Sequence, residues 1–144
     1  MTEDFSFRFR RGPHGLAANL RAGAHPLEEA PAQGGIQIHG SIRLALPEPG
    51  LHWKDAAWLA FGVSLNAPAL SRLRPEGTLI RVAALDYPLS DYRAEVAALA
   101  MDGWLRARFA VETSGASVEY DTVRDQYAFT WGDVADPFSD APRG

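Results

Sequence analysis

The segment 77–109 constrains the fold most, because it joins a β-branched run to an alanine-rich stretch through a turn. The run 78–82 reads Thr-Leu-Ile-Arg-Val, which is typical of a buried strand. The stretch 94–100 is rich in alanine, which is the best helix former and a poor strand residue. We therefore predict a strand at 78–82 and a helix at about 91–109.

Two interpretations of 91–109 remain open. As a helix, it begins at a cap oxygen from Ser90 or Asp91, and Asp102 and Arg106 form an i,i+4 ion pair. As a hairpin, Asp102-Gly103 is a type I′ turn signal, and the apolar residues after it alternate with polar ones. The alanines favour the helix.

Alternating apolar residues predict strands elsewhere in the chain. The stretch 5–10 places three phenylalanines on one face, and 36–46 predicts a long strand that is bulged or bent at Gly40. Two further alternating stretches, 117–123 and 126–131, flank a tight turn. These two stretches predict a C-terminal hairpin.

Three stretches carry less definite patterns. Glycines and prolines recur through 15–35, which predicts a loop with a short helical turn at 16–21. The stretch 55–66 satisfies both the helical and the strand period, and its Gly-Val pair and following Asn-Ala-Pro favour a strand. We expect a short helical turn at 70–73.

These elements predict a single α+β domain over residues 1–132. Its mostly antiparallel sheet has about five or six strands, and one main helix, at about 91–109, packs on one face. A β-α-β-α order over 55–109 is the alternative architecture. Residues 133–144 form an acidic tail with little apolar content, so we expect it to be flexible, either frayed or draped on the surface.

Composition excludes several classes of site. The chain has 144 residues, 47% of them hydrophobic, so one domain can bury a core without metal or disulfide crosslinks. It has no cysteine, which excludes disulfides, thiolate zinc sites and cysteine-ligated iron–sulfur clusters. No apolar run approaches the roughly 18 residues of a membrane helix, and no leader pattern opens the chain. We expect a soluble, cytoplasmic protein with no membrane partner.

The charge distribution argues against general nucleic-acid binding. The formal net charge is −4, and residues 118–144, with six acids and two arginines, supply all of it. Affinity for nucleic acid comes largely from neutralised phosphates, which requires a basic surface. The local exception lies near the N-terminus, where alternating phenylalanines and arginines give a weaker RNA- or ribosome-contacting alternative: Phe7, Arg8, Phe9, Arg10 and Arg11.

The sequence carries no catalytic, metal or cofactor motif. The four histidines lie 11 to 14 positions apart, so no two share the close spacing of a zinc pair: His14, His25, His39 and His52. A nucleophile elbow, a phosphate loop and a dinucleotide fingerprint are all missing. We predict no metal and no cofactor, and an enzyme is the less favoured class.

One turn nevertheless gathers polar side chains where a strand gives way to a helix, a position that often lines binding clefts. A bland explanation, in which the turn caps the helix and its tyrosines pack, is favoured over a ligand site. The ligand-binding candidates are Asp86, Tyr87, Asp91, Tyr92 and Arg93, together with His39.

Tryptophans supply the candidate interaction surface, because tryptophan is enriched at binding hot spots. The candidates are Trp53, Trp58 and Trp104, although core packing is the commoner fate of such residues. With no catalytic signature, we predict a non-catalytic protein-binding or regulatory module, such as a small acidic inhibitor or partner protein. A small-molecule binder or enzyme that uses the 86–93 turn is the alternative.

Overall fold

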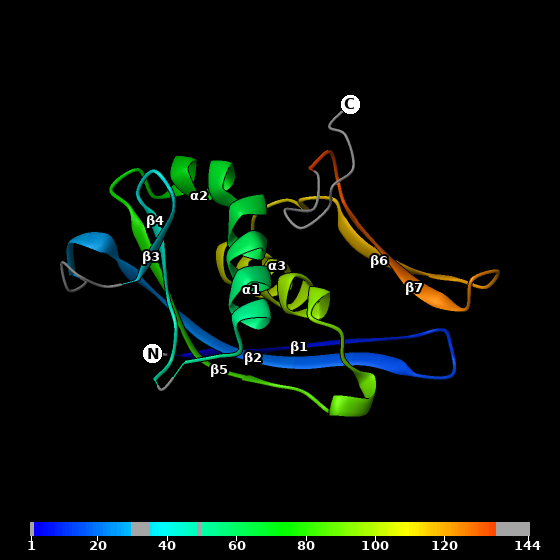
Figure 1. Ribbon diagram of the computed structural model, residues 1–144. Coiled ribbons are helices and arrows are strands. Elements are labelled where there is room, and N and C mark those ends of the chain that lie inside the picture. Colours follow the sequence, from blue (N-terminus) through cyan, green and yellow to red (C-terminus); the bar gives the residue numbers. More distant parts are fainter. Residues whose placement is uncertain (1, 30–34, 49, 135–144) are drawn as a thin grey trace.

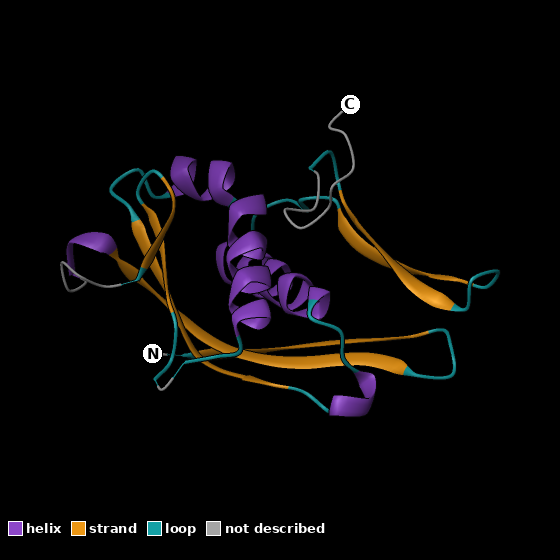
Figure 2. Cartoon of the chain, in the orientation of Figure 1, coloured by secondary structure: helices purple, strands orange, loops and turns teal. Residues whose placement is uncertain are grey.

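A curved sheet of five strands carries helices on one face, and a separate hairpin lies beside those helices (Figures 1 and 2). The computed structural model describes residues 2–29, 35–48 and 50–134. The elements in chain order are β1 (Glu3–Arg10), β2 (Gly15–Pro26), η1 (Leu27–Glu29), β3 (Ile36–His39), β4 (Ile42–Ala45), α1 (Trp53–Leu65), α2 (Ala67–Leu73), β5 (Thr78–Asp86), η2 (Leu89–Asp91), α3 (Glu95–Phe109), β6 (Ala116–Asp121) and β7 (Gln126–Trp131).

The predicted α+β class is confirmed, with a sheet that is mixed rather than purely antiparallel. Its strand order is β1-β2-β5-β4-β3, and the described strands pair antiparallel except for β4 and β5. The chain between β4 and β5 contains α1 and α2. A parallel pair needs a long crossover connection of this kind, so the two helices explain the single parallel pairing.

The stretch 15–35 is not the predicted loop over its first half. Residues Gly15–Pro26 form β2, a long strand between β1 and β5, and the expected helical turn at 16–21 is wrong. The strand is rich in small residues and is paired on both sides. Every second side chain from 16 to 22 points into the core. The inward residues are Leu16, Ala18, Leu20 and Ala22.

The stretch 36–46 contains two short strands rather than one bent strand. β3 and β4 form a hairpin in which His39 pairs with Ile42. Gly40 has a φ of +53°, in the left-handed region that glycine enters most easily, and it reverses the chain. The glycine that suggested a bulge therefore marks the turn.

The stretch 55–66 is helical, contrary to the predicted strand. Residues 55–65 belong to α1, and Asn66 is its C-cap. This helix packs against α3 on the same face of the sheet, so two helices replace the one main helix expected there (Figure 2). Gly62 explains the misleading pattern. A Cβ at Gly62 would lie 2.8 Å from the carbonyl oxygen of Ala98 and 2.9 Å from the Cβ of Met101. The glycine permits close contact between helices, and does not mark a strand.

The predicted helix in 91–109 is confirmed as α3, which begins at Glu95. The predicted side-chain cap is wrong, because Ala94 occupies the N-cap position without a side-chain hydrogen bond. The predicted ion pair joins Arg106 Nε to Asp102 Oδ2 at 3.3 Å. Asp102 is buried, and its Oδ1 also accepts hydrogen bonds from the side chains of Asn66 and Ser114. The short helical turn expected at 70–73 is part of α2.

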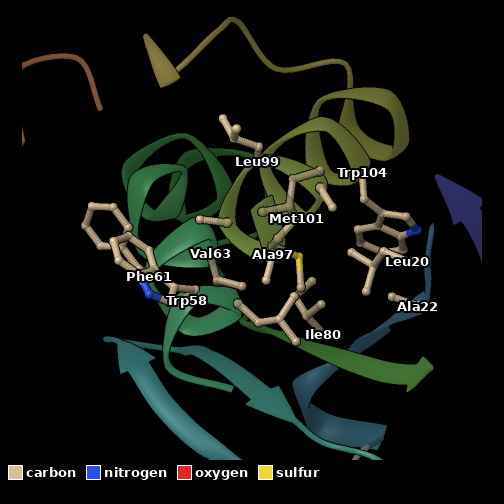
Figure 3. Packing of buried hydrophobic residues seen from close by; sticks show 14 of the residues in the cluster. Leu20, Ala22, Trp58, Phe61, Val63, Ile80, Ala97, Leu99, Met101 and Trp104 are labelled. Carbon is tan, nitrogen blue, oxygen red and sulfur yellow. The ribbon is translucent and has the colours of Figure 1, made fainter. Parts of the chain in front are cut away.

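The core lies between the sheet and the two long helices. Figure 3 shows Ile80 of β5 below Val63 of α1 and Met101 of α3, and Leu20 of β2 next to the indole of Trp104. The side chains of Ile80, Val63, Met101 and Leu20 are fully buried. Burial of this apolar face, at about 25 cal/mol per Å², is the main favourable contribution to folding.

The predicted C-terminal hairpin is confirmed as β6 and β7, which pair antiparallel and form a sheet of their own. An isolated two-stranded hairpin is at best marginally stable in water, so its packing against the domain matters. The indole of Trp131 lies 5.4 Å from that of Trp58 and 5.3 Å from the ring of Phe61, centroid to centroid. The predicted tail begins just after β7, and residues 135–144 lie outside the described part of the chain.

Substitution of Gly62 tests the helix contact. We expect Gly62→Ala to lower the free energy of unfolding by about 1–3 kcal/mol, because the added methyl meets backbone that cannot move aside. Ser64→Ala, on the exposed side of the same helix, serves as the control and should stay within about 0.5 kcal/mol. Denaturant unfolding measures both. A Gly62→Ala protein as stable as the wild type would contradict the close approach of α1 and α3.

Candidate functional site

The 86–93 turn meets α1 at a buried carboxylate. Asp55, in the first turn of α1, is 5% exposed. Its Oδ2 accepts a hydrogen bond from the hydroxyl of Tyr87 and its Oδ1 from that of Tyr92, each at 2.7 Å. The two phenol rings stack 3.4 Å apart at 7°. A buried carboxylate is costly unless its oxygens are bonded, and the two phenols meet that requirement.

The same contacts raise the pKa of both phenols. The hydrogen bond to Asp55, together with burial and the charge of that carboxylate, raises the pKa of Tyr87 to about 12. Burial, followed by the hydrogen bond and the charge of Asp55, raises the pKa of Tyr92. Both hydroxyls therefore carry their protons at neutral pH and act as donors. The cluster joins α1 to the turn.

The other acidic candidates of the turn point elsewhere. Asp91 Oδ1 accepts a hydrogen bond from the backbone N–H of Gly15 at 3.3 Å, which ties η2 to the start of β2. Asp86 is exposed at the end of β5, opposite Asn19 of β2. The turn therefore brings Tyr87 and Tyr92 together and leaves its carboxylates apart.

Arg93 links the N-terminal end of α3 to the hairpin. Its Nη1 donates to the carbonyl oxygen of Tyr127 at 3.1 Å, and its Nη2 lies 2.6 Å from Glu95 Oε2. The guanidinium carbon also lies 4.9 Å from the ring centroid of Phe129. These contacts combine a charge-assisted hydrogen bond with a cation–π interaction across β7.

His39 is not brought to this turn. It lies in β3 beside Ile42 of β4, and Ile42 pairs with Thr78 at the beginning of β5. Asp86 ends the same nine-residue strand. The histidine and the turn therefore lie toward opposite ends of β5.

An open recess lies next to the turn, and we call it the Trp53 cleft. It has a volume of about 450 Å³. Trp53, which is 62% exposed, forms one side, and the ammonium of Lys54 lies 5.6 Å from its ring centroid. Together, α1 and the N-terminal end of α3 supply its lining: Trp53, Lys54, Trp58, Arg93, Ala94 and Glu95. The cleft thus combines aromatic surface with two cations and one anion.

A second recess, of about 480 Å³, adjoins the Trp53 cleft along β7. Arg93 and Glu95 line both recesses. The hairpin side consists of Tyr127, Phe129, Thr130 and Trp131, followed by Gly132 and Val134. The aromatic surface therefore continues from α1 to the point where the chain leaves β7.

The three tryptophans predicted for an interaction surface lie in different surroundings. Trp104 is 2% exposed, and its Nε1 donates to the carbonyl oxygen of Glu3 at 3.1 Å, so it belongs to the core. Trp58 is 6% exposed and also lines the cleft. Trp53 is the member of this set that presents most of its side chain to solvent.

The phenylalanines of the RNA alternative face the helices. Phe7 and Phe9 are half-buried against the core cluster, and the ring of Phe9 lies 5.8 Å from that of Tyr127. The guanidinium of Arg11 lies 4.9 Å from the Phe9 ring centroid. Base stacking requires a ring face open to solvent, which these contacts restrict.

Within residues 2–29, 35–48 and 50–134, no three His, Asp or Glu side chains gather closely enough to hold a metal ion. In the same residues, no helix combines the length and apolarity needed to cross a membrane. Comparisons with protein-family models, curated proteins and solved structures give no match to this chain. The site is therefore interpreted from its own geometry.

Sequence reasoning missed Asp55, although a signal was present. In a helix, Asp55 shares its face with Leu59 and Gly62, all three of which are buried. A lone acid on an otherwise buried helix face indicates a carboxylate that needs donors. The strand interpretation of 55–66 hid this periodicity.

The raised pKa of Tyr87 predicts a specific loss of stability in alkali. The folded protein holds this proton up to about pH 12, whereas the unfolded chain releases it near 10.0. The stability that the phenol contributes is therefore complete below pH 10 and is lost as the pH rises through about 12.

Comparison with Tyr87→Phe isolates this contribution. We expect the difference in free energy of unfolding between the wild type and Tyr87→Phe to stay constant from pH 7 to about 9 and to shrink above pH 10, because the Tyr87 phenol is the one ionisable group that the variant lacks. Denaturant unfolding at each pH measures it. A difference that is the same at pH 8 and pH 12 would rule out the proposed phenol–carboxylate bond.

Proposed function

We propose that this protein is a non-catalytic protein-binding module that docks its partner in the Trp53 cleft. The observation that carries the proposal is the 62% exposure of Trp53 at the edge of a recess that also holds Lys54 and Arg93. Exposed tryptophan beside arginine is characteristic of binding hot spots, where a large rigid ring supplies contact area at little entropic cost.

The hydrogen bonds and ion pairs of Asp55, the two tyrosines and Arg93 favour binding over catalysis. Asp55 is held by two phenols, and the pKa of each phenol is raised, so neither activates the other for proton transfer at neutral pH. Arg93 is engaged by Tyr127 and Glu95. A catalytic group near neutral pH would need a freer proton or an unshared base.

The chemistry of the cleft indicates the kind of partner. Aromatic rings accept apolar or aromatic side chains, and Lys54 adds a positive charge that no ion pair among the described residues neutralises. The partner segment that fits best is therefore acidic and carries an aromatic or apolar anchor. A protein with this property serves as an inhibitor or as a regulatory subunit.

Affinity capture with matched variants tests the proposal. The wild-type chain should recover a stoichiometric partner from the native lysate, and Trp53→Ala should weaken that complex about thirtyfold, which corresponds to about 2 kcal/mol. Leu89→Ala is the control, because Leu89 is 89% exposed but lies outside the cleft. Recovery of no stoichiometric partner, or equal recovery with Trp53→Ala, would overturn the proposal.

A further inference from the structure

The two edges of the five-stranded sheet differ in how well they are protected against further pairing. β3, at one edge, has four residues and a register shift against β4. β1, at the other edge, has eight residues, contains no proline and pairs with β2 in unbroken register. Short strands, bulges and prolines are the features that discourage pairing at an edge, and β1 lacks all three. Among the described strands β2 alone pairs with β1, so the outer backbone groups of β1 are available to another strand.

The available part of this edge is the stretch 4–10. At Glu3 the carbonyl oxygen already accepts a hydrogen bond from Trp104 Nε1 at 3.1 Å, and the carboxylate lies 3.3 Å from Arg108 Nε. Helix α3 therefore occupies the first residue of the strand. The strand ends at Arg10, before the turn that leads into β2. Phe7 is the midpoint of the stretch that remains.

The charges of β1 change sign from one end of this stretch to the other. Asp4 is at its beginning, and Arg8 and Arg10 are near its end. A second copy that runs antiparallel about Phe7 places Asp4 opposite Arg10 at both ends of the ladder and Ser6 opposite Arg8. Opposite charges directly across a strand pair are favourable and like charges are unfavourable. The strand is thus complementary to an antiparallel copy of itself.

Asp4 can accept a donor from a second copy without losing its contact within the chain. Its Oδ1 lies 2.9 Å from Arg21 Nε, and its side chain is still 49% exposed. A carboxylate has about four lone-pair sites, so Oδ2 can receive a guanidinium of the other copy. The carboxylate would then lie between two arginines, one from each copy.

The phenylalanines of β1 match in the same register. Phe5, Phe7 and Phe9 point to the face that carries the helices, and all three are half-buried. Phe5 lies against Gly103 of α3, and Phe9 lies against Tyr127 of β7. Antiparallel pairing sets Phe7 opposite its own copy and Phe5 opposite Phe9, with Cβ atoms about 4.5–5.5 Å apart. Aromatic pairs at this separation stabilise the strand pair and remove further ring surface from water.

We propose that β1 pairs antiparallel with β1 of a second copy of this chain about a two-fold axis at Phe7, so that the two five-stranded sheets form one continuous sheet. The contact is self-complementary, as a two-fold interface requires. This inference goes beyond the proposed function and does not depend on it, because the residues that line the Trp53 cleft lie in and near α1 and α3 and not in β1.

Sedimentation velocity of the full chain over a range of concentrations tests the pairing. We expect the wild type to form a dimer that dissociates on dilution. Asp4→Arg sets two arginines opposite each other at both ends of the ladder, and Arg10→Asp sets two aspartates there, so each variant alone should dimerise about tenfold more weakly. An equimolar mixture of the two variants restores opposite charges and should dimerise like the wild type. Arg72→Asp, at an exposed arginine of α2, is the control and should dimerise like the wild type.

Disulfide formation tests the register separately. The chain has no cysteine, so introduced cysteines in a mixture report contacts between copies. Ser6→Cys mixed with Arg8→Cys should give a disulfide-linked dimer, because these positions lie directly opposite each other in the proposed ladder. Val123→Cys, at a residue that is 93% exposed between β6 and β7, mixed with Arg8→Cys is the control and should give little.

Three results would overturn the proposal. The first is a wild type that stays monomeric at every concentration. The second is a dimer that Asp4→Arg and Arg10→Asp leave unchanged, which would place the contact at another surface. The third is a control mixture that yields as much disulfide as the pair at 6 and 8.

Discussion

The β6–β7 hairpin depends on side chains for its attachment, and the candidate site depends on that attachment. Among the described residues, no backbone hydrogen bond joins the hairpin to the five-stranded sheet. Trp131 packs instead against Trp58 and Phe61, and the hydroxyl of Tyr127 bonds to the backbone of the 11–14 turn. Since two strands alone are marginally stable, these contacts hold the hairpin in place. Arg93 lines both recesses, and its guanidinium donates a hydrogen bond to the carbonyl oxygen of Tyr127 in the docked hairpin.

The helix pair explains why those contacts form where they do. Gly62 lets α1 approach α3 closely, which fixes the side of α1 that remains free for Trp131. The same placement brings Asp55 opposite Tyr92, shortly before α3 begins. One close helix contact thus orients the tyrosine–aspartate cluster and the edge of the Trp53 cleft together.

Local patterns predicted the elements that are stabilised locally. The alanines of α3 and the alternating aromatics of β7 each favour one structure, and the structure agrees. The predictions for 15–26 and 55–66 were wrong because tertiary contacts override the local sequence pattern there. Glycines in β2 are tolerated because the strand is paired on both sides, and Gly62 serves a helix interface that one chain segment cannot reveal. Asp55 was not predicted for the same reason, because its hydrogen-bond donors, Tyr87 and Tyr92, are distant in sequence. The 86–93 turn was predicted as a candidate site because its polar residues are adjacent in sequence.

Native-state hydrogen exchange of Trp131→Ala tests the central claim most directly, namely that aromatic side chains hold the hairpin against the helices. Trp131 is 5% exposed, and truncation of a buried aromatic costs about 3–5 kcal/mol. If its packing holds the hairpin, the amides of β6 and β7 should exchange at least about a hundredfold faster, while those of β2 and β5 keep most of their protection. Wild-type protection of β6 and β7 in the variant would contradict the account.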